Sequence, residues 1–127
     1  MDHNKTAQAT GKPKISQSVL AFAGDFIGMG KTLDERNIRL TAASCAWNIA
    51  SNIPEFRKKH LDHYMREYKR YNPRTNEADL AAIRKDIETL IAKKLELFPD
   101  DLRQIVNTNI SIVGGKDYVE VAAARLQ

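Results

Sequence analysis

The sequence lacks several of the features by which small proteins are assigned to a functional class. Its 127 residues include one cysteine, Cys45, which excludes an intrachain disulfide and suits a reducing compartment. The longest apolar run, from Val19 to Ala23, has five residues, whereas a membrane-spanning helix needs about 20. Polar residues precede this run, so the segment is also a poor signal peptide. We therefore expect a cytoplasmic protein without a membrane helix.

Motifs for catalysis and ligand binding are also absent. Gly28–Thr32 resembles the end of a phosphate-binding loop, but the Walker spacing requires glycine where Asp25 stands. His60 and His63 are three residues apart, whereas zinc-protease helices place them four apart, so we interpret them as solvated histidines. Cys45 has apolar neighbours, which are typical of a core thiol. We expect no enzyme activity, no cofactor and no metal site.

The overall composition is that of an ordinary globular chain. Hydrophobic residues make up 43% and charged residues 28%, which are close to average values, and the length suits one domain. Residues 1–14 contain three lysines, a glycine and a proline, which predicts a flexible basic arm. Residues 15–127 are predicted to form a single helical domain.

Four helices are predicted from apolar periodicity and from residues that begin or end helices. They cover residues 15–27, 33–51, 54–71 and 77–98. Glycines end the first helix, and Thr32 with Glu35 forms a capping box for the second. Pro54 suits the first turn of the third helix, and Asn76 is a favourable cap for the fourth. Trp47 is expected to be buried, with its indole N–H bonded to one acceptor.

A fifth helix is predicted after these four. It begins at Pro99, because proline is favourable in a first turn and the two aspartates that follow suit the helix dipole. Leu102, Ile105 and Val106 are then expected to face inward.

Residues 108–126 fit two different structures. Alternating apolar residues on either side of Gly114–Gly115 are typical of a β-hairpin. Asp117 and Glu120, followed by three alanines, are instead typical of a short capped helix. We favour the helix, because an isolated two-stranded hairpin is only marginally stable. The predicted fold is thus all-α, a small helical bundle of about five helices, with a β-hairpin as the alternative for the C-terminal segment.

The most informative segment covers residues 54–74, which include the third helix. It carries seven cations against three anions. The cations are Arg57, Lys58, Lys59, Arg66, Lys69, Arg70 and Arg74. A basic helix face of this kind can bind nucleic-acid phosphates or an acidic partner. An apolar stripe on the same helix includes Tyr64, Met65, Tyr68 and Tyr71, which are residue types enriched at protein interfaces.

Two functions follow from these patterns. The first is a non-enzymatic protein-interaction module that binds a protein partner or a second copy of itself, as a homo-oligomer. The alternative is a nucleic-acid-binding protein that uses the basic helix at residues 54–74 and the N-terminal arm. We rank the interaction module first because residues 77–127 hold seven cations and nine anions, so the basic helix can pair within the chain.

Overall fold

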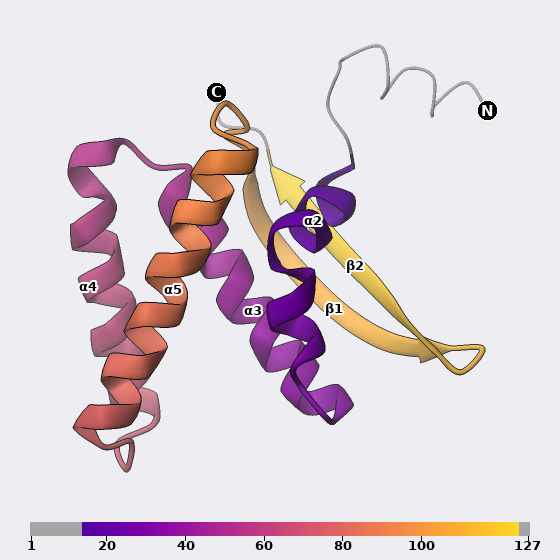
Figure 1. The fold of residues 1–127 in the computed structure, drawn as a ribbon, viewed down its shortest axis with the longest axis horizontal. Coiled ribbons are helices and arrows are strands. Elements are labelled where there is room, and N and C mark those ends of the chain that lie inside the picture. Colours follow the sequence, from indigo (N-terminus) through magenta and orange to yellow (C-terminus); the bar gives the residue numbers. More distant parts are fainter. Residues whose placement is uncertain (1–13, 125–127) are drawn as a thin grey trace.

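The computed structural model describes residues 14–124, which form four helices followed by an antiparallel hairpin of two strands (Figure 1). The elements, labelled as in Figure 1, are α2 (Ile15–Gly28), α3 (Leu33–Ala50), α4 (Pro54–Tyr71), α5 (Glu77–Leu97), β1 (Gln104–Val113) and β2 (Lys116–Ala124). The four predicted helices are confirmed to within a residue or so at each end. Residues 1–13 of the predicted arm lie outside the described residues.

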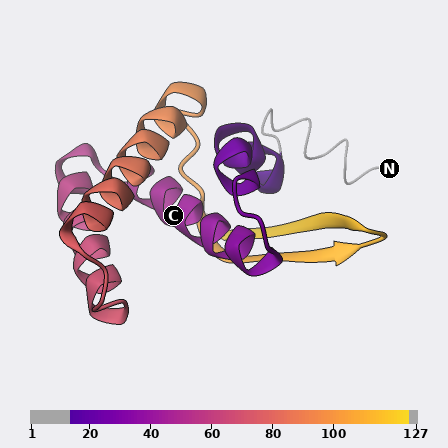
Figure 2. The same ribbon diagram turned by 60° about the horizontal axis from the view of Figure 1, so that its bottom comes forward.

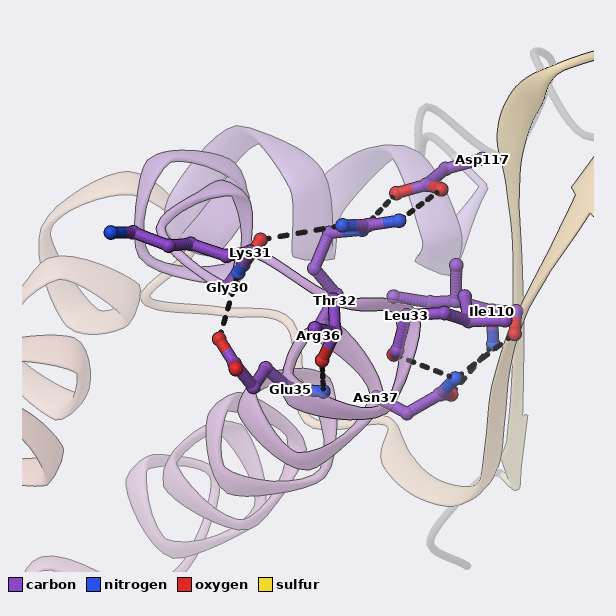
Figure 3. A network of polar contacts seen from close by, with 9 residues as sticks. All are labelled: Gly30, Lys31, Thr32, Leu33, Glu35, Arg36, Asn37, Ile110 and Asp117. Atoms are coloured by element: carbon purple, nitrogen blue, oxygen red, sulfur yellow. Dashed lines mark hydrogen bonds and ion pairs between the residues drawn. The ribbon is translucent and has the colours of Figure 1, made fainter.

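Local side-chain contacts explain where the helices begin. Thr32 Oγ1 accepts a hydrogen bond of 3.1 Å from the Glu35 amide, and Glu35 Oε1 accepts one of 2.8 Å from the Lys31 amide (Figure 3). Asn76 Oδ1 accepts one of 2.8 Å from the Asp79 amide at the start of α5. These contacts satisfy amide groups that a helix leaves unpaired in its first turn. The predicted caps of α3 and α5 are therefore confirmed.

The predicted fifth and final helices are wrong, and the hairpin alternative is confirmed. Gly114 and Gly115 have φ values of 59° and 78°, the left-handed backbone that a two-residue hairpin turn requires. Strand β1 begins at Gln104 and takes in Ile105 and Val106 of the predicted fifth helix, and β2 includes the three alanines assigned to the last helix. Tertiary packing decides the outcome, because one face of the hairpin covers α2 and α3 and overrides local helix propensity.

The hydrophobic core lies between α2, α3, α5 and the hairpin. Trp47 is fully buried, with its ring centroid 5.4 Å from that of Phe22 and 5.7 Å from that of Phe98. Its indole Nε1 donates a hydrogen bond of 2.8 Å to the Arg103 carbonyl, just before β1. The expectation of a buried tryptophan with one acceptor is therefore confirmed. The indole links the last turn of α3 to the start of the hairpin.

Two asparagines of α3 attach the hairpin to the helices. The Asn37 amide bonds both backbone groups of Ile110, at 2.8 and 3.0 Å, and the Asn48 amide does the same for Ile105, at 2.7 and 2.9 Å. Asn37 and Asn48 are eleven residues apart on the helix, and Ile105 and Ile110 are five residues apart on the strand. Each separation is about 16 Å, so the two asparagines have the same spacing as the two isoleucines that they bond. The helix α3 therefore closes one edge of β1.

The elements lie on two sides of α3. The α4–α5 pair lies on one side, and α2 with the hairpin lies on the other (Figures 1 and 2). The turn of the hairpin projects beyond the ends of the helices in Figure 2. Arg36 near the start of α3 holds this region, because its Nε and Nη2 bond the two carboxylate oxygens of Asp117 at 2.6 and 3.0 Å (Figure 3).

Candidate interaction groove

A groove lies between α3 and the α4–α5 pair. Figure 1 shows that α3 and this pair diverge from one another. Its volume is about 660 Å³, and its walls come from the start of α3, the end of α4 and the middle of α5. The apolar lining consists of Phe26, Ile38, Ala42, Tyr64, Tyr68, Ile83 and Ile87. Ile38 is 66% exposed, so the chain leaves a large aliphatic side chain uncovered at this position. Exposed apolar surface in a concave site is typical of a binding surface.

The helix α4 is held at its beginning and its middle, which leaves its last two turns to form a wall of the groove. Pro54 occupies the first turn, and Arg57 Nε donates a hydrogen bond of 3.1 Å to the Ala50 carbonyl at the end of α3. Asp62 accepts hydrogen bonds from Lys58 at 2.9 Å and from Arg84 of α5 at 2.7 Å. These bonds lower the pKa of the Asp62 carboxyl below its ordinary value.

Tyr64, one of the two tyrosines in the groove, remains neutral across the physiological pH range. Tyr64 and Tyr68 are half-buried, and their ring centroids are 6.4 Å apart. Burial raises the pKa of Tyr64 to about 12, with smaller contributions from Cys45 and Tyr68. Tyrosines of this kind offer an apolar ring together with a hydroxyl group that can bond a partner.

Charged groups flank the apolar lining. Arg39 is engaged within the chain, because its Nη1 donates a hydrogen bond of 3.0 Å to the Phe26 carbonyl and its guanidinium lies 4.7 Å from the Phe26 ring centroid. Asp86 is exposed and has no ion-pair partner among residues 14–124. A second hollow of about 670 Å³ shares Tyr68, Ile83 and Asp86 with the groove and extends to the α4–α5 turn. The free carboxylate thus stands between two adjoining hollows.

Four of the seven predicted site cations are engaged within the chain, and three of these help to position α4. Arg57 bonds the end of α3, as described, and Lys58 pairs with Asp62. Lys69 Nζ donates hydrogen bonds of 2.9 and 2.7 Å to the Pro73 and Thr75 carbonyls in the α4–α5 turn. These groups help to position α4, so the seven cations do not act as one exposed set.

Arg70, the fourth engaged cation, is exposed together with Lys59, Arg66 and Arg74. Lys59, Arg66 and Arg70 occur at i, i+7 and i+11, which places them in a row on one face of α4. Arg70 bonds Glu67 at 3.3 Å and stacks 5.4 Å from the Tyr71 ring centroid. Arg74 follows the helix and lines the hollow at the α4–α5 turn.

The remaining residues singled out from the sequence do not form a reactive site. His60 and His63 are exposed on α4, and no group of three His, Cys, Asp or Glu side chains within residues 14–124 could hold a metal ion. Burial raises the pKa of the Cys45 thiol, which disfavours the reactive thiolate. No helix in the described part of the chain has the length and apolar character to cross a membrane.

Sequence reasoning missed two buried charged residues, Lys94 and Asp101. Lys94 of α5 is fully buried, its Nζ lies 4.9 Å from the Trp47 ring centroid, and it donates a hydrogen bond of 2.5 Å to the Asp101 carbonyl. Burial lowers the pKa of Lys94. The signal was present, because Lys94 falls four residues after Leu90 on the apolar stripe of α5.

Comparison with known proteins adds no relative to this description. The chain matches no protein-family model, no curated protein and no solved structure.

Proposed function

We propose that this chain is a non-enzymatic protein-interaction module of the cytoplasm, and that the groove between α3, α4 and α5 binds a segment of a partner protein. The observation that carries the proposal is the uncovered apolar lining, with Ile38 66% exposed beside Tyr64, Tyr68 and Ile83. Grooves between helices commonly bind an amphipathic helix through apolar residues spaced three or four apart. The single, half-buried Cys45 suits a reducing compartment.

The charges near the groove specify the chemistry of the partner segment. The Arg39 guanidinium bonds the Phe26 carbonyl and stacks on the Phe26 ring. The Asp86 carboxylate, by contrast, is exposed and has no ion-pair partner among the described residues. Glu35 adds a second carboxylate to the groove lining. We therefore infer a partner segment with an apolar face flanked by lysine or arginine.

The test is selection from a phage-displayed library of random 16-residue peptides, with the full chain as bait. We expect enriched peptides to carry apolar residues at helical spacing together with Lys or Arg. A synthetic copy of the most enriched peptide should shift the amide NMR signals of Ile38, Ala42 and Ile83. Ile38→Glu should abolish binding. Val106→Glu is the matched control, because Val106 is 65% exposed but lies on the hairpin.

Two results would overturn this proposal. One is the absence of any enriched peptide from a library that yields binders for a known helix-binding domain. The other is a peptide whose binding survives Ile38→Glu while Val106→Glu abolishes it. Both variants replace exposed side chains, so circular dichroism should show the native helical content for each.

The row of cations on α4 supports a second candidate function, binding of nucleic acid. Lys59, Arg66 and Arg70 span about 16 Å of the helix, which can follow a phosphate backbone. With about three phosphates neutralised, log K should fall with log salt at a slope near −2.7. Fluorescence polarisation with a 20-base-pair duplex measures this slope. No binding at low salt, or binding that is unchanged by Lys59→Ala with Arg66→Ala, would exclude this function.

A further inference from the structure

The two strands of the hairpin have different outer edges. On β1, the Asn37 and Asn48 side chains bond the backbone groups of Ile110 and Ile105 that point away from β2. On β2, no hydrogen bond within residues 14–124 reaches the opposite edge. The helix α2 contacts β2 and crosses its C-terminal part in Figure 1, whereas the part near the turn extends beyond the helices in Figure 2. The chain thus closes the outer edge of β1 and leaves the outer edge of β2 open near the turn.

The register of the hairpin identifies the open groups. The Ile110 amide donates to Asn37, so it does not donate to its partner in β2, Val119. In an antiparallel pair, opposite residues either exchange both hydrogen bonds or exchange none. The amide and carbonyl of Val119 therefore point away from β1, and by alternation those of Asp117 and Val121 do so as well.

The open edge lacks two of the devices that keep strands from pairing with other chains, a proline and a bulge. The strand β2 has no proline, and the one irregularity in the pairing lies at Val106 of β1. The hairpin turn projects beyond the helices in Figure 2, so access to this edge is unobstructed near the turn. A continuous open edge of this kind is a template for pairing with another strand.

The residues of β2 specify which strand fits. Lys116, Tyr118 and Glu120 are exposed and alternate along β2, so they lie on one face of the ribbon. In an antiparallel pair of two β2 strands centred on Tyr118, Lys116 of each copy lies opposite Glu120 of the other, and the two Tyr118 rings lie side by side. Opposite charges and aromatic pairs at facing positions stabilise antiparallel strands.

We propose that two copies of this chain associate by antiparallel pairing of their β2 edges around a two-fold axis at Tyr118, forming a four-stranded sheet. Asp117 of one copy and Val119 of the other exchange backbone hydrogen bonds, and the symmetry repeats this pair. Pairing near the turns places the two sets of helices towards opposite ends of the sheet. The contact is short, so we expect weak association, measurable near 100 µM protein.

This inference specifies a second copy as one partner of the proposed interaction module, but it uses a surface separate from the groove. Ile38→Glu should therefore leave self-association unchanged, and a β2 variant should leave peptide binding unchanged. Either proposal can fail while the other stands.

The decisive experiment is a charge exchange, measured by sedimentation equilibrium of the full chain. Lys116→Glu and Glu120→Lys should each weaken association by about tenfold, because each places like charges opposite one another twice. The double variant should restore association to within about twofold of the original, because it recreates both pairs with reversed polarity. Lys93→Glu is the matched control, since Lys93 is exposed on α5.

A second measurement tests the position of the axis. In a Cys45→Ala background, Tyr118→Cys should form a disulfide-linked dimer under mild oxidation, because residues on the axis face each other at a closely spaced position. Glu120→Cys should cross-link slowly, because its sulfurs are about 13 Å apart in this register. A monomer at 200 µM, no restoration by the double variant, or equal cross-linking at both positions would overturn the proposal.

Discussion

Asn37 binds Ile110 as a neighbouring strand would, donating to its carbonyl at 3.0 Å and accepting from its amide at 2.8 Å. Asn48 repeats this arrangement at Ile105, three helical turns further along α3. The helix thus supplies the hydrogen bonds that a third strand would give to β1. Few other side chains could do so, because this geometry needs a donor and an acceptor at the end of one short side chain.

Removing either asparagine amide should loosen the hairpin. We expect Asn37→Ala and Asn48→Ala each to lower the free energy of unfolding by about 1–3 kcal/mol, because each leaves two backbone groups without a protein partner. Urea titration followed by circular dichroism measures the loss. Thr41→Ala is the control on the same helix, since Thr41 is exposed and bonds only the Asn37 carbonyl within α3. Unchanged stability in both asparagine variants would show that packing alone holds the hairpin.

The indole of Trp47 should stabilise the fold through both its size and its hydrogen bond. Trp47→Phe removes the bond to the Arg103 carbonyl and leaves unfilled volume beside Phe22 and Phe98, so we expect a loss of about 2–4 kcal/mol. Thermal unfolding followed by circular dichroism gives the difference. Because Trp47 is the only tryptophan, the native chain should also emit at short wavelength and shift to the red on unfolding. Emission typical of an exposed indole in the native state would contradict the buried position.

Lys94 should make stability depend on pH in the alkaline range. Its pKa is lowered in the folded chain, while the unfolded chain keeps the ordinary value of 10.5. At each pH in this range the unfolded state therefore holds more protons than the folded state. The free energy of unfolding should for this reason increase from pH 8 to pH 10. Above pH 10 the raised pKa of Tyr64, about 12, acts in the opposite direction.

The comparison for this prediction is Lys94→Met, which keeps the length of the side chain without its charge. At pH 7 this variant should be at least as stable as the original, because it removes a buried charge and keeps an apolar side chain of similar length beside Trp47. Its stability should not rise between pH 8 and pH 10. Guanidinium titrations at pH 7, 8, 9 and 10 test both statements, and parallel pH profiles for the two proteins would contradict the role of Lys94.

Two glycines should respond in opposite directions to the same substitution. An added Cβ at Gly30 would lie 2.8 Å from the Arg36 amide nitrogen, so Gly30→Ala should destabilise by about 1–3 kcal/mol. An added Cβ at Gly24 meets no atom within 4 Å, so Gly24→Ala should stabilise α2 by up to about 1 kcal/mol. Thermal unfolding of both variants gives the comparison. A destabilised Gly24→Ala variant would show that α2 is more closely covered than described here.

Elements with local signals were predictable from the sequence, and elements that depend on distant contacts were not. The caps at Thr32 and Asn76 act within one helical turn, so the starts of α3 and α5 could be found from sequence. The alanines of β2 favour helix locally, and only packing of the hairpin against α2 and α3 reverses this preference. Sequence alone does not show that packing.

The same distinction applies to the surfaces. The stripe containing Tyr64 and Tyr68 was visible from periodicity, but its partial exposure depends on the divergence of α3 from the α4–α5 pair. The basic character of α4 was also visible. The carbonyl partners of Arg57 and Lys69 were not, because they lie at an adjoining helix end and in a turn.

The ion pair between Arg36 and Asp117 joins residues that are 81 positions apart in the chain. A ribosome adding ~5–20 residues per second needs about 4–16 s to cover this distance. During that interval α2 and α3 have been synthesised, but the strands that cover their apolar face have not. We expect this helix pair to be the part of the nascent chain most open to chaperones, and completion of β2 to end that exposure.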